Sequence, residues 1–177
     1  MAGEEAHGVE DTDRGAGLSP ALRALKERTA QLLPWLEEDT LTVGLPAFRV
    51  LREELLRTVR TLREHPDLAF DYLSCLSGVD YPERVDVVYH LFRIADGLGI
   101  CLKVGAPKDD CRLASVTSVW PGANWHEREV FDLLGVHFEG HPDLRRILMP
   151  EGFDGGYPLR KDYVDKRPPR QRLVRPR

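Results

Sequence analysis

Residues 85–104 read VDVVYHLFRIADGLGICLKV, and this stretch decides the fold class. β-Branched and aromatic residues fill Val85–Ile94 and Leu98–Val104, which is typical of strands. The Asp96-Gly97 step between the two runs is a hairpin signal. Phe70–Leu76 is a similar run shortly upstream. The sequence therefore predicts a meander of three or four strands.

Helical periodicity precedes these strands. Ser19-Pro20 predicts a helix start, with a capping hydroxyl followed by proline, and Pro34 ends that helix. A second helix is predicted from one apolar stripe and closes at His65-Pro66. The stripe consists of Phe48, Leu51, Leu55, Val59 and Leu62. Between the two helices, Thr40–Val43 favours an edge strand. Helices followed by a meander indicate an α/β (α+β) fold, with N-terminal helices packed on a mixed or antiparallel sheet.

The chain becomes irregular after the meander. Residues 123–134 predict one further short helix, which carries both charged and apolar residues. Beyond Gly135, glycine and proline recur every few residues. We therefore predict a disordered acidic leader over 1–18, an α/β domain over 19–134, and an extended partner-binding tail over 135–177.

Composition and charge describe a soluble globular chain with one unusual end. Of the 177 residues, 42% are hydrophobic and 31% are charged, and no apolar run is long enough for a membrane-spanning helix. The acidic start of the chain resembles neither a secretory signal nor a transit peptide. Residues 160–177 carry eight bases and two acids. Such a basic end is typical of a segment that lies on nucleic acid, on an acidic protein surface or on an anionic membrane.

Motifs for catalysis, metals and cofactors do not emerge. Cys75, Cys101 and Cys111 lie far apart and form no CxxC pair, which disfavours a zinc or iron–sulfur site and a disulfide scaffold. His126-Glu127 begins a zinc-protease motif, but Val130 stands where the second histidine is required. We therefore expect no catalytic residue, no metal and no cofactor on this chain. A small metal-dependent hydrolase using His126, His137 and His141 stays an alternative, which stoichiometric zinc would favour.

Charge is concentrated in the third predicted helix. Arg128 and Asp132 are four residues apart and can pair there, while Glu127 falls on a face with apolar neighbours. A carboxylate buried in that way needs a cation, because its desolvation is costly. The candidate cations are Arg145, Arg146, Arg160 and Lys161. The block is either a solvated helix face or an interface.

The same block carries a family resemblance. Residues 127–150, EREVFDLLGVHFEGHPDLRRILMP, resemble the signature of the C subunit of bacterial NADH–quinone oxidoreductase, which is the 30 kDa subunit of respiratory complex I. The positions that fit are Glu127, Arg128, Glu129, Asp132, Leu133, Leu134, His141, Arg145, Ile147 and Leu148. Residues 76–81, 115–125 and 156–163 resemble further segments of that family. Two positions depart from it: Tyr157 replaces a usual histidine, and Val164 a usual proline.

The resemblance implies a structural role without redox chemistry. A member of this family lies in the peripheral arm, on the cytoplasmic face of the bacterial inner membrane, and contacts the D and B subunits. FMN and the iron–sulfur clusters belong to other subunits of the complex. The interface residues implied are Glu127, Arg128, Glu129, Asp132, His141, Arg145, Tyr157, Arg160, Lys161, Asp162 and Tyr163. An equivalent subunit of a membrane-bound hydrogenase or of an other-donor dehydrogenase remains the alternative. Nucleic-acid binding rests on the basic end alone.

Overall fold

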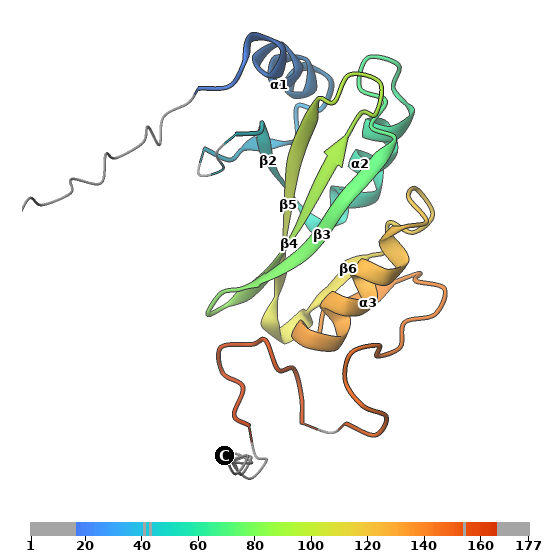
Figure 1. Ribbon diagram of the computed structural model, residues 1–177. Coiled ribbons are helices and arrows are strands. Elements are labelled where there is room, and N and C mark those ends of the chain that lie inside the picture. Colours follow the sequence, from blue (N-terminus) through green and yellow to red (C-terminus); the bar gives the residue numbers. More distant parts are fainter. Residues whose placement is uncertain (1–16, 41, 43, 154, 166–177) are drawn as a thin grey trace, which may run out of the picture.

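The computed structural model describes residues 17–40, 42, 44–153 and 155–165, which form helices packed on a five-stranded sheet (Figure 1). The sheet order is β1-β2-β5-β4-β3. The strands are β1 (Glu37–Glu38), β2 (Ala47–Val50), β3 (Tyr72–Asp80), β4 (Arg84–Phe92) and β5 (Gly99–Pro107). The predicted α+β fold is therefore confirmed.

The meander of β3, β4 and β5 forms the larger part of the sheet. These strands pair antiparallel, with Val87 opposite both Gly78 and Val104. Gly97 closes the turn between β4 and β5 with φ of +69°, a left-handed conformation that glycine adopts without steric cost. The hairpin predicted from Asp96-Gly97 is thus present. β2 pairs parallel to β5, which makes the sheet mixed.

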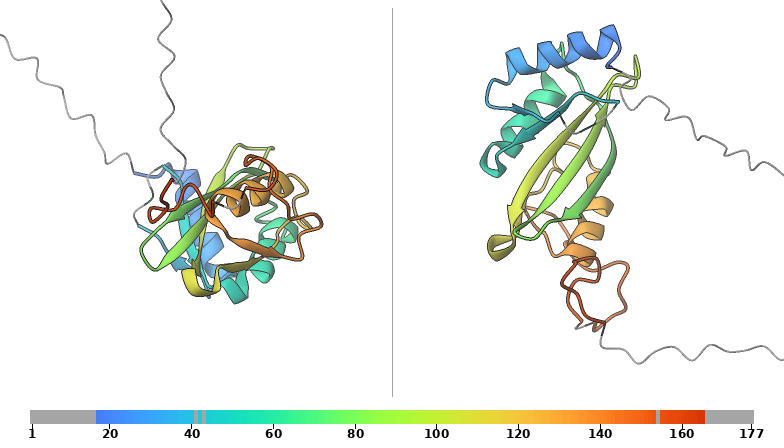
Figure 2. Two further views of the ribbon diagram at one scale, coloured as in Figure 1. Left: turned by 90° about the horizontal axis from the view of Figure 1, so that it is seen from below. Right: turned by 90° about the vertical axis from the view of Figure 1, so that its left-hand side faces the viewer.

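Helices α1 (Pro20–Leu32) and α2 (Leu55–Glu64) lie together on one side of the sheet (Figure 2). The Ser19 hydroxyl accepts the Leu22 N–H and Pro20 is the first helical residue, as predicted. α2 ends at Glu64, directly before His65-Pro66. Its residues Leu55, Val59 and Leu62 are fully buried in the core.

The prediction of a helix was wrong for the first two residues of the apolar stripe. Phe48 belongs to β2, and Leu51 is 68% exposed in front of a short 3₁₀ helix, η1 (Arg52–Glu54). Parallel pairing of Ala47–Val50 with β5 fixes this segment as a strand. The edge strand expected over Thr40–Val43 lies partly outside the described residues, and β1 forms at Glu37–Glu38 instead.

A second, smaller sheet joins the last helix to the core. α3 (Ala123–Leu134) has the predicted bounds and packs against β3. β6 (Arg112–Ala114) and β7 (His137–Glu139) pair parallel on either side of α3 in sequence, and η2 (Lys108–Asp110) precedes them. Val136 and Phe138 are buried in the same core cluster as the sheet. The hydrophobic core thus extends past residue 134, because the pairing of β7 with β6 places these two side chains in it. The predicted leader lies, apart from residues 17 and 18, outside the described residues.

Candidate functional site

Glu127 lies fully buried in the first half of α3. Its carboxylate accepts hydrogen bonds from the Ser115 hydroxyl and the Val116 N–H, both at 2.7 Å. Burial raises the pKa of Glu127 to about 7, because desolvation outweighs these two bonds. The expected cation is not there: Arg145, Arg146 and Arg160 bind other groups.

Tyr89 of β4 belongs to the same buried region. Its side chain is fully buried, and its hydroxyl has no hydrogen-bond partner among the described residues. Burial raises the pKa of Tyr89 well above its usual value, and the charge of Glu127 raises it further. Burial thus shifts both acids toward their neutral forms.

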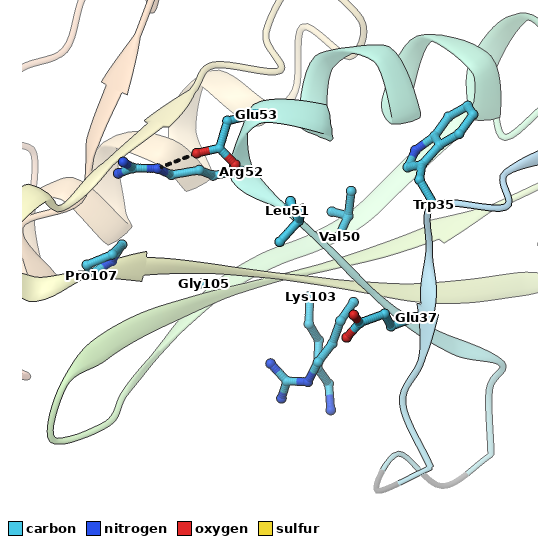
Figure 3. A pocket seen from close by; sticks show the side chains of 10 residues that line it. Trp35, Glu37, Val50, Leu51, Arg52, Glu53, Lys103, Gly105 and Pro107 are labelled. Atoms are coloured by element: carbon cyan, nitrogen blue, oxygen red, sulfur yellow. Dashed lines mark hydrogen bonds and ion pairs between the residues drawn. The ribbon is translucent and has the colours of Figure 1, made fainter.

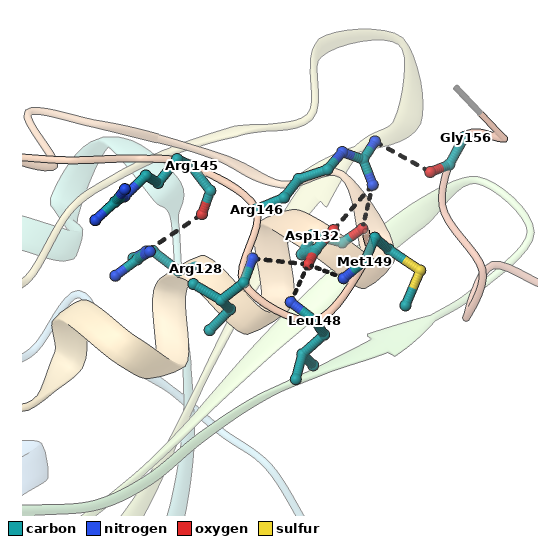
Figure 4. Close-up of polar contacts among 8 residues, drawn as sticks. Arg128, Asp132, Arg145, Arg146, Leu148, Met149 and Gly156 are labelled. Carbon is teal, nitrogen blue, oxygen red and sulfur yellow. Dashed lines mark hydrogen bonds and ion pairs between the residues drawn. The ribbon is translucent and has the colours of Figure 1, made fainter. Parts of the chain in front are cut away.

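Asp132, in the second half of α3, is buried as completely but is held differently (Figure 4). Its Oδ2 accepts three consecutive backbone N–H groups, at 2.7–3.0 Å. The donors are Ile147, Leu148 and Met149. Arg146 donates to its Oδ1 at 2.9 Å. Desolvation opposes the charge of Asp132, but these four donors outweigh it and lower its pKa.

Arg146 connects Asp132 to the tail of the chain. Besides Asp132, it donates to the carbonyl of Gly156 at 3.2 Å. Its guanidinium lies 5.5 Å from the centre of the Phe153 ring and 5.4 Å from that of Tyr157. Arg160 lies over the same Tyr157 ring at 4.7 Å. Cations over aromatic faces stabilise such contacts, so Arg146, Phe153, Tyr157 and Arg160 are held together.

Arg128 does not form the predicted ion pair with Asp132. Its Nε donates to the carbonyl of Arg145 at 3.2 Å, and its guanidinium lies 4.8 Å from the centre of the Trp125 ring. The pairing is wrong because Asp132 is fully enclosed by the donors that follow Arg145 in sequence. Arg128 is only 6% exposed, and its bond to Arg145 holds the start of the loop whose residues 146–149 enclose Asp132.

The described part of the tail lies along its own domain. Leu159 N–H donates to the Leu133 carbonyl at 3.0 Å, and Arg160 Nε to the Leu134 carbonyl at 2.6 Å. The Lys161 N–H donates to buried Asp80, which also pairs with Lys108. Tyr157 and Arg160, expected to anchor a partner, are therefore engaged within this chain. The end of α3 offers unpaired carbonyls, which explains why this segment binds there.

The remaining predicted residues have lesser roles. His141 bonds through Nε2 to the Asn124 carbonyl and accepts the Asp143 N–H at Nδ1. Tyr163 is half-buried, and its N–H donates to the Arg160 carbonyl. Four predicted residues have exposed side chains: Glu129, Arg145, Lys161 and Asp162. The contacts of Arg146, Asp80 and Ser115 were not predicted from the sequence, since they join residues far apart in the chain.

Metal-binding geometry is absent from the described part of the chain. No three histidine, cysteine, aspartate or glutamate side chains gather there as a metal site would require. His141 has both ring nitrogens bonded to backbone groups. His126, His137 and His141, the residues of the hydrolase alternative, therefore form no such group in the described structure.

A pocket of about 480 Å³ lies away from α3, where β2 leaves the sheet (Figure 3). Trp35, Leu51 and Pro107 supply its apolar lining. The basic residues beside it already have partners, since Arg52 pairs with Asp110 and Lys103 with Asp39. Apart from Glu37, the charged side chains that line the pocket are thus paired, whereas a small-molecule site has several polar groups that converge on the ligand.

The α3 site joins segments of the chain that lie far apart in the sequence. Its buried carboxylates fix the loops before and after the helix. Large apolar side chains stay in solvent around them: Trp125 of α3 and, in the chain that follows it, Leu148, Leu159 and Val164 are each more than half exposed. Exposed apolar residues among arginines are typical of protein interfaces. No described helix has the length and apolar character needed to cross a membrane.

Comparisons with known proteins agree on one family. The profile described as "Respiratory-chain NADH dehydrogenase, 30 Kd subunit" matches residues 48–169. The second NADH-quinone oxidoreductase C subunit of Rhizobium meliloti (strain 1021) is 49% identical over 125 residues, which cover 68% of this chain and 66% of the relative. For it and for the corresponding C subunit of Roseiflexus sp. (strain RS-1), the match spans less than two thirds of the relative's own length.

Two solved structures share the fold. A chain of an archaeal respiratory membrane complex, the membrane-bound sulfane sulfur reductase, superposes with a TM-score of 0.70 at 26% identity, covering 80% of this chain and 85% of that chain. A trypsin-resistant fragment of Nqo5 superposes with a TM-score of 0.56 at 33% identity, covering 69% of this chain and 97% of the fragment.

Proposed function

Since the chain belongs to the family of the respiratory-chain NADH dehydrogenase 30 kDa subunit, we propose that it is a non-catalytic structural subunit of a proton-translocating NADH–quinone oxidoreductase. It would support electron transfer from NADH to quinone without carrying a redox group. FMN and the iron–sulfur clusters would be held by other subunits. Its place would be the peripheral arm, at the cytoplasmic face of the membrane, against the D and B subunits.

The proposal depends on the contacts that two residues of the family signature make. Asp132 and Arg128 bind the loop over residues 145–149. The result is a rigid end of the molecule from which Trp125, Leu148 and Leu159 project. Desolvated aromatic and apolar residues supply most of the affinity at protein interfaces, so we propose that this end contacts the partner subunits.

Purification of the assembled complex tests the proposal. An affinity tag on the full chain in its native host should recover, from detergent-solubilised membranes, a flavin-bearing NADH-oxidising subunit and NADH-dependent quinone reduction. Leu159→Asp should reduce that recovery at least tenfold, while Ile94→Asp should not. Ile94 is a matched control because it is 70% exposed in the turn between β4 and β5. Recovery of the chain alone would contradict the proposal.

A second candidate keeps the role and changes the complex. The archaeal sulfane sulfur reductase chain superposes over a larger share of this chain than the Nqo5 fragment does. An equivalent subunit of a membrane-bound hydrogenase or of a dehydrogenase with another electron donor is therefore the alternative. Co-purified subunits without an NADH-oxidising flavoprotein would favour it.

A further inference from the structure

The two edges of the main sheet differ in length and charge. At one edge, β1 has two residues, Glu37 and Glu38, and both are exposed acids. At the other edge, β3 runs for nine residues from Tyr72 to Asp80, with a bulge at Ser74 and regular pairing from Cys75 to Asp80. Short, charged edge strands resist pairing with other chains, whereas a long neutral one invites it. The sheet is thus protected at β1 and open to pairing at β3.

The backbone of β3 is paired on one side. Among the described residues, its ladder joins it to β4, and no backbone–backbone hydrogen bond joins it to a further segment. In an antiparallel pair the backbone groups of alternate residues point away from the partner. The outer side of β3 therefore presents donors and acceptors to another extended chain, in regular alternation over Cys75–Asp80, beyond the bulge at Ser74.

The side chains of β3 place no charge along this edge. Tyr72 is 49% exposed and Val79 41%, and Ser74 and Ser77 are exposed between them. The single charged residue of the strand, Asp80, is buried and paired with Lys108. An added strand would meet aromatic, aliphatic and hydroxyl groups on this face, with no charge to repel it.

The opposite face of β3 is supported by a helix. Gly78 packs so closely on α3 that an added Cβ would lie 2.3 Å from Leu134 and 3.2 Å from Val130. In Figure 1, β3 is the outermost strand of the sheet on the side of α3. This contact holds β3 in place, so the edge is a rigid template before any partner arrives.

We propose that the outer edge of β3 pairs with an extended, uncharged segment of a neighbouring subunit, which adds a sixth strand to the sheet. The inference rests on the proposed function, because it requires a neighbour within the assembled complex. One strand pair buries far less than the roughly 1,200 Å² of a stable interface, so two free copies of this chain would not hold together through it. A segment of a subunit docked elsewhere on this chain binds instead at high effective concentration.

Photo-crosslinking in the assembled complex tests the pairing. A benzophenone amino acid replaces Tyr72 or Val79 in the tagged full chain, and crosslinked peptides are identified after purification from membranes. Both probes should reach one segment of one other subunit, at positions six or seven residues apart. On β4 the partners of Tyr72 and Val79 are Phe92 and Asp86, which sets this spacing. A matched probe at Glu38, on the acidic edge, should give less than a tenth of that yield.

Each other outcome overturns the pairing. Crosslinks to a second copy of this chain would show a dimer edge. Crosslinks to unrelated segments, or at three to four residue spacing, would show a loop or a helix against β3. Absence of crosslinks from a complex that co-purifies normally would show a free edge and leave the proposed function intact. Failure of co-purification would instead remove the proposed function.

Discussion

The two halves of α3 treat a buried carboxylate in opposite ways. Glu127 and Asp132 are five residues apart on one helix, and neither has measurable solvent exposure. The pKa of Glu127 is raised to about 7, whereas that of Asp132 is lowered. Two neutral donors reach Glu127, while three backbone N–H groups and a guanidinium reach Asp132. Burial opposes the charge of both acids: it outweighs two neutral donors at Glu127, whereas three backbone N–H groups and a guanidinium outweigh it at Asp132.

Because their pKa values differ, the two carboxyl groups hold their neighbouring segments in different ways. An ionised, fully bonded Asp132 attaches the loop at 145–149 to the helix. A carboxyl that is half protonated near neutral pH, as Glu127 is, makes the attachment of Ser115 and Val116 dependent on pH. Substitutions at the two ends of α3 should accordingly differ in size, in sign and in pH dependence.

The largest effect is expected from Asp132→Ala. This change leaves Arg146 and three backbone N–H groups without their acceptor, and removing one member of a buried charged pair costs about 3–5 kcal/mol. Urea unfolding of the full chain should measure a loss in that range. Asp162→Ala is the control, because that side chain is exposed. Equal, small effects of both would mean that Asp132 is not an anchor.

Glu127→Gln should raise the free energy of unfolding at high pH, whereas Asp132→Ala should lower it. The pKa of Glu127 in the folded state exceeds its unfolded value, so stability is greatest below about 4.5, falls until about 7, and is then constant. The shift corresponds to at most about 3 kcal/mol. Glutamine cannot ionise, so the variant should be more stable at pH 8, and this gain should vanish at pH 4.5. Its amide can still accept from Val116 and donate to Ser115.

Unfolding curves at several pH values check this prediction. Glu129→Gln is the matched control on the exposed face of α3 and should show no gain at pH 8. A gain for Glu127→Gln that is the same at pH 4.5 and pH 8 would contradict the role assigned to its ionisation.

Gly135→Ala should cost about 2 kcal/mol at the junction between α3 and the tail. Gly135 has φ of +77°, where a side chain costs roughly 1–2 kcal/mol, and the new Cβ would lie 2.4 Å from the Tyr157 ring. Gly140→Ala has a similar φ of +81° and open space, so it reports the backbone cost alone. If the two variants were equally stable, Tyr157 would not be packed on this glycine.

The smallest effect is expected from Arg128→Ala, at about 1 kcal/mol. Arg128 makes one hydrogen bond to the Arg145 carbonyl and lies over Trp125, without a carboxylate partner. Its loss should lower the amount of assembled complex more than it lowers the stability of the isolated chain. Arg145→Ala keeps the backbone acceptor and should be close to wild type. A loss as large as that of Asp132→Ala would imply the ion pair that the structure lacks.

The sequence by itself determined the elements whose signals are local. α3 begins at Ala123 and ends at Leu134 as predicted, because its pattern is continuous and Gly135 stops it. The meander and the Gly97 turn followed from β-branched runs with a glycine between them. The family signature was likewise readable, since it depends on residue order alone.

Tertiary structure decided the partners of the charged residues and of the isolated strands. Spacing along a helix favoured Arg128 as the partner of Asp132, but a loop more than ten residues later offered four donors in place of one. Phe48 followed a helical spacing, yet Ala47–Val50 became a strand because β5, some fifty residues away, pairs with it. A buried carboxylate or a strand binds whatever the folded chain brings to it, and neighbours along the sequence do not reveal that choice.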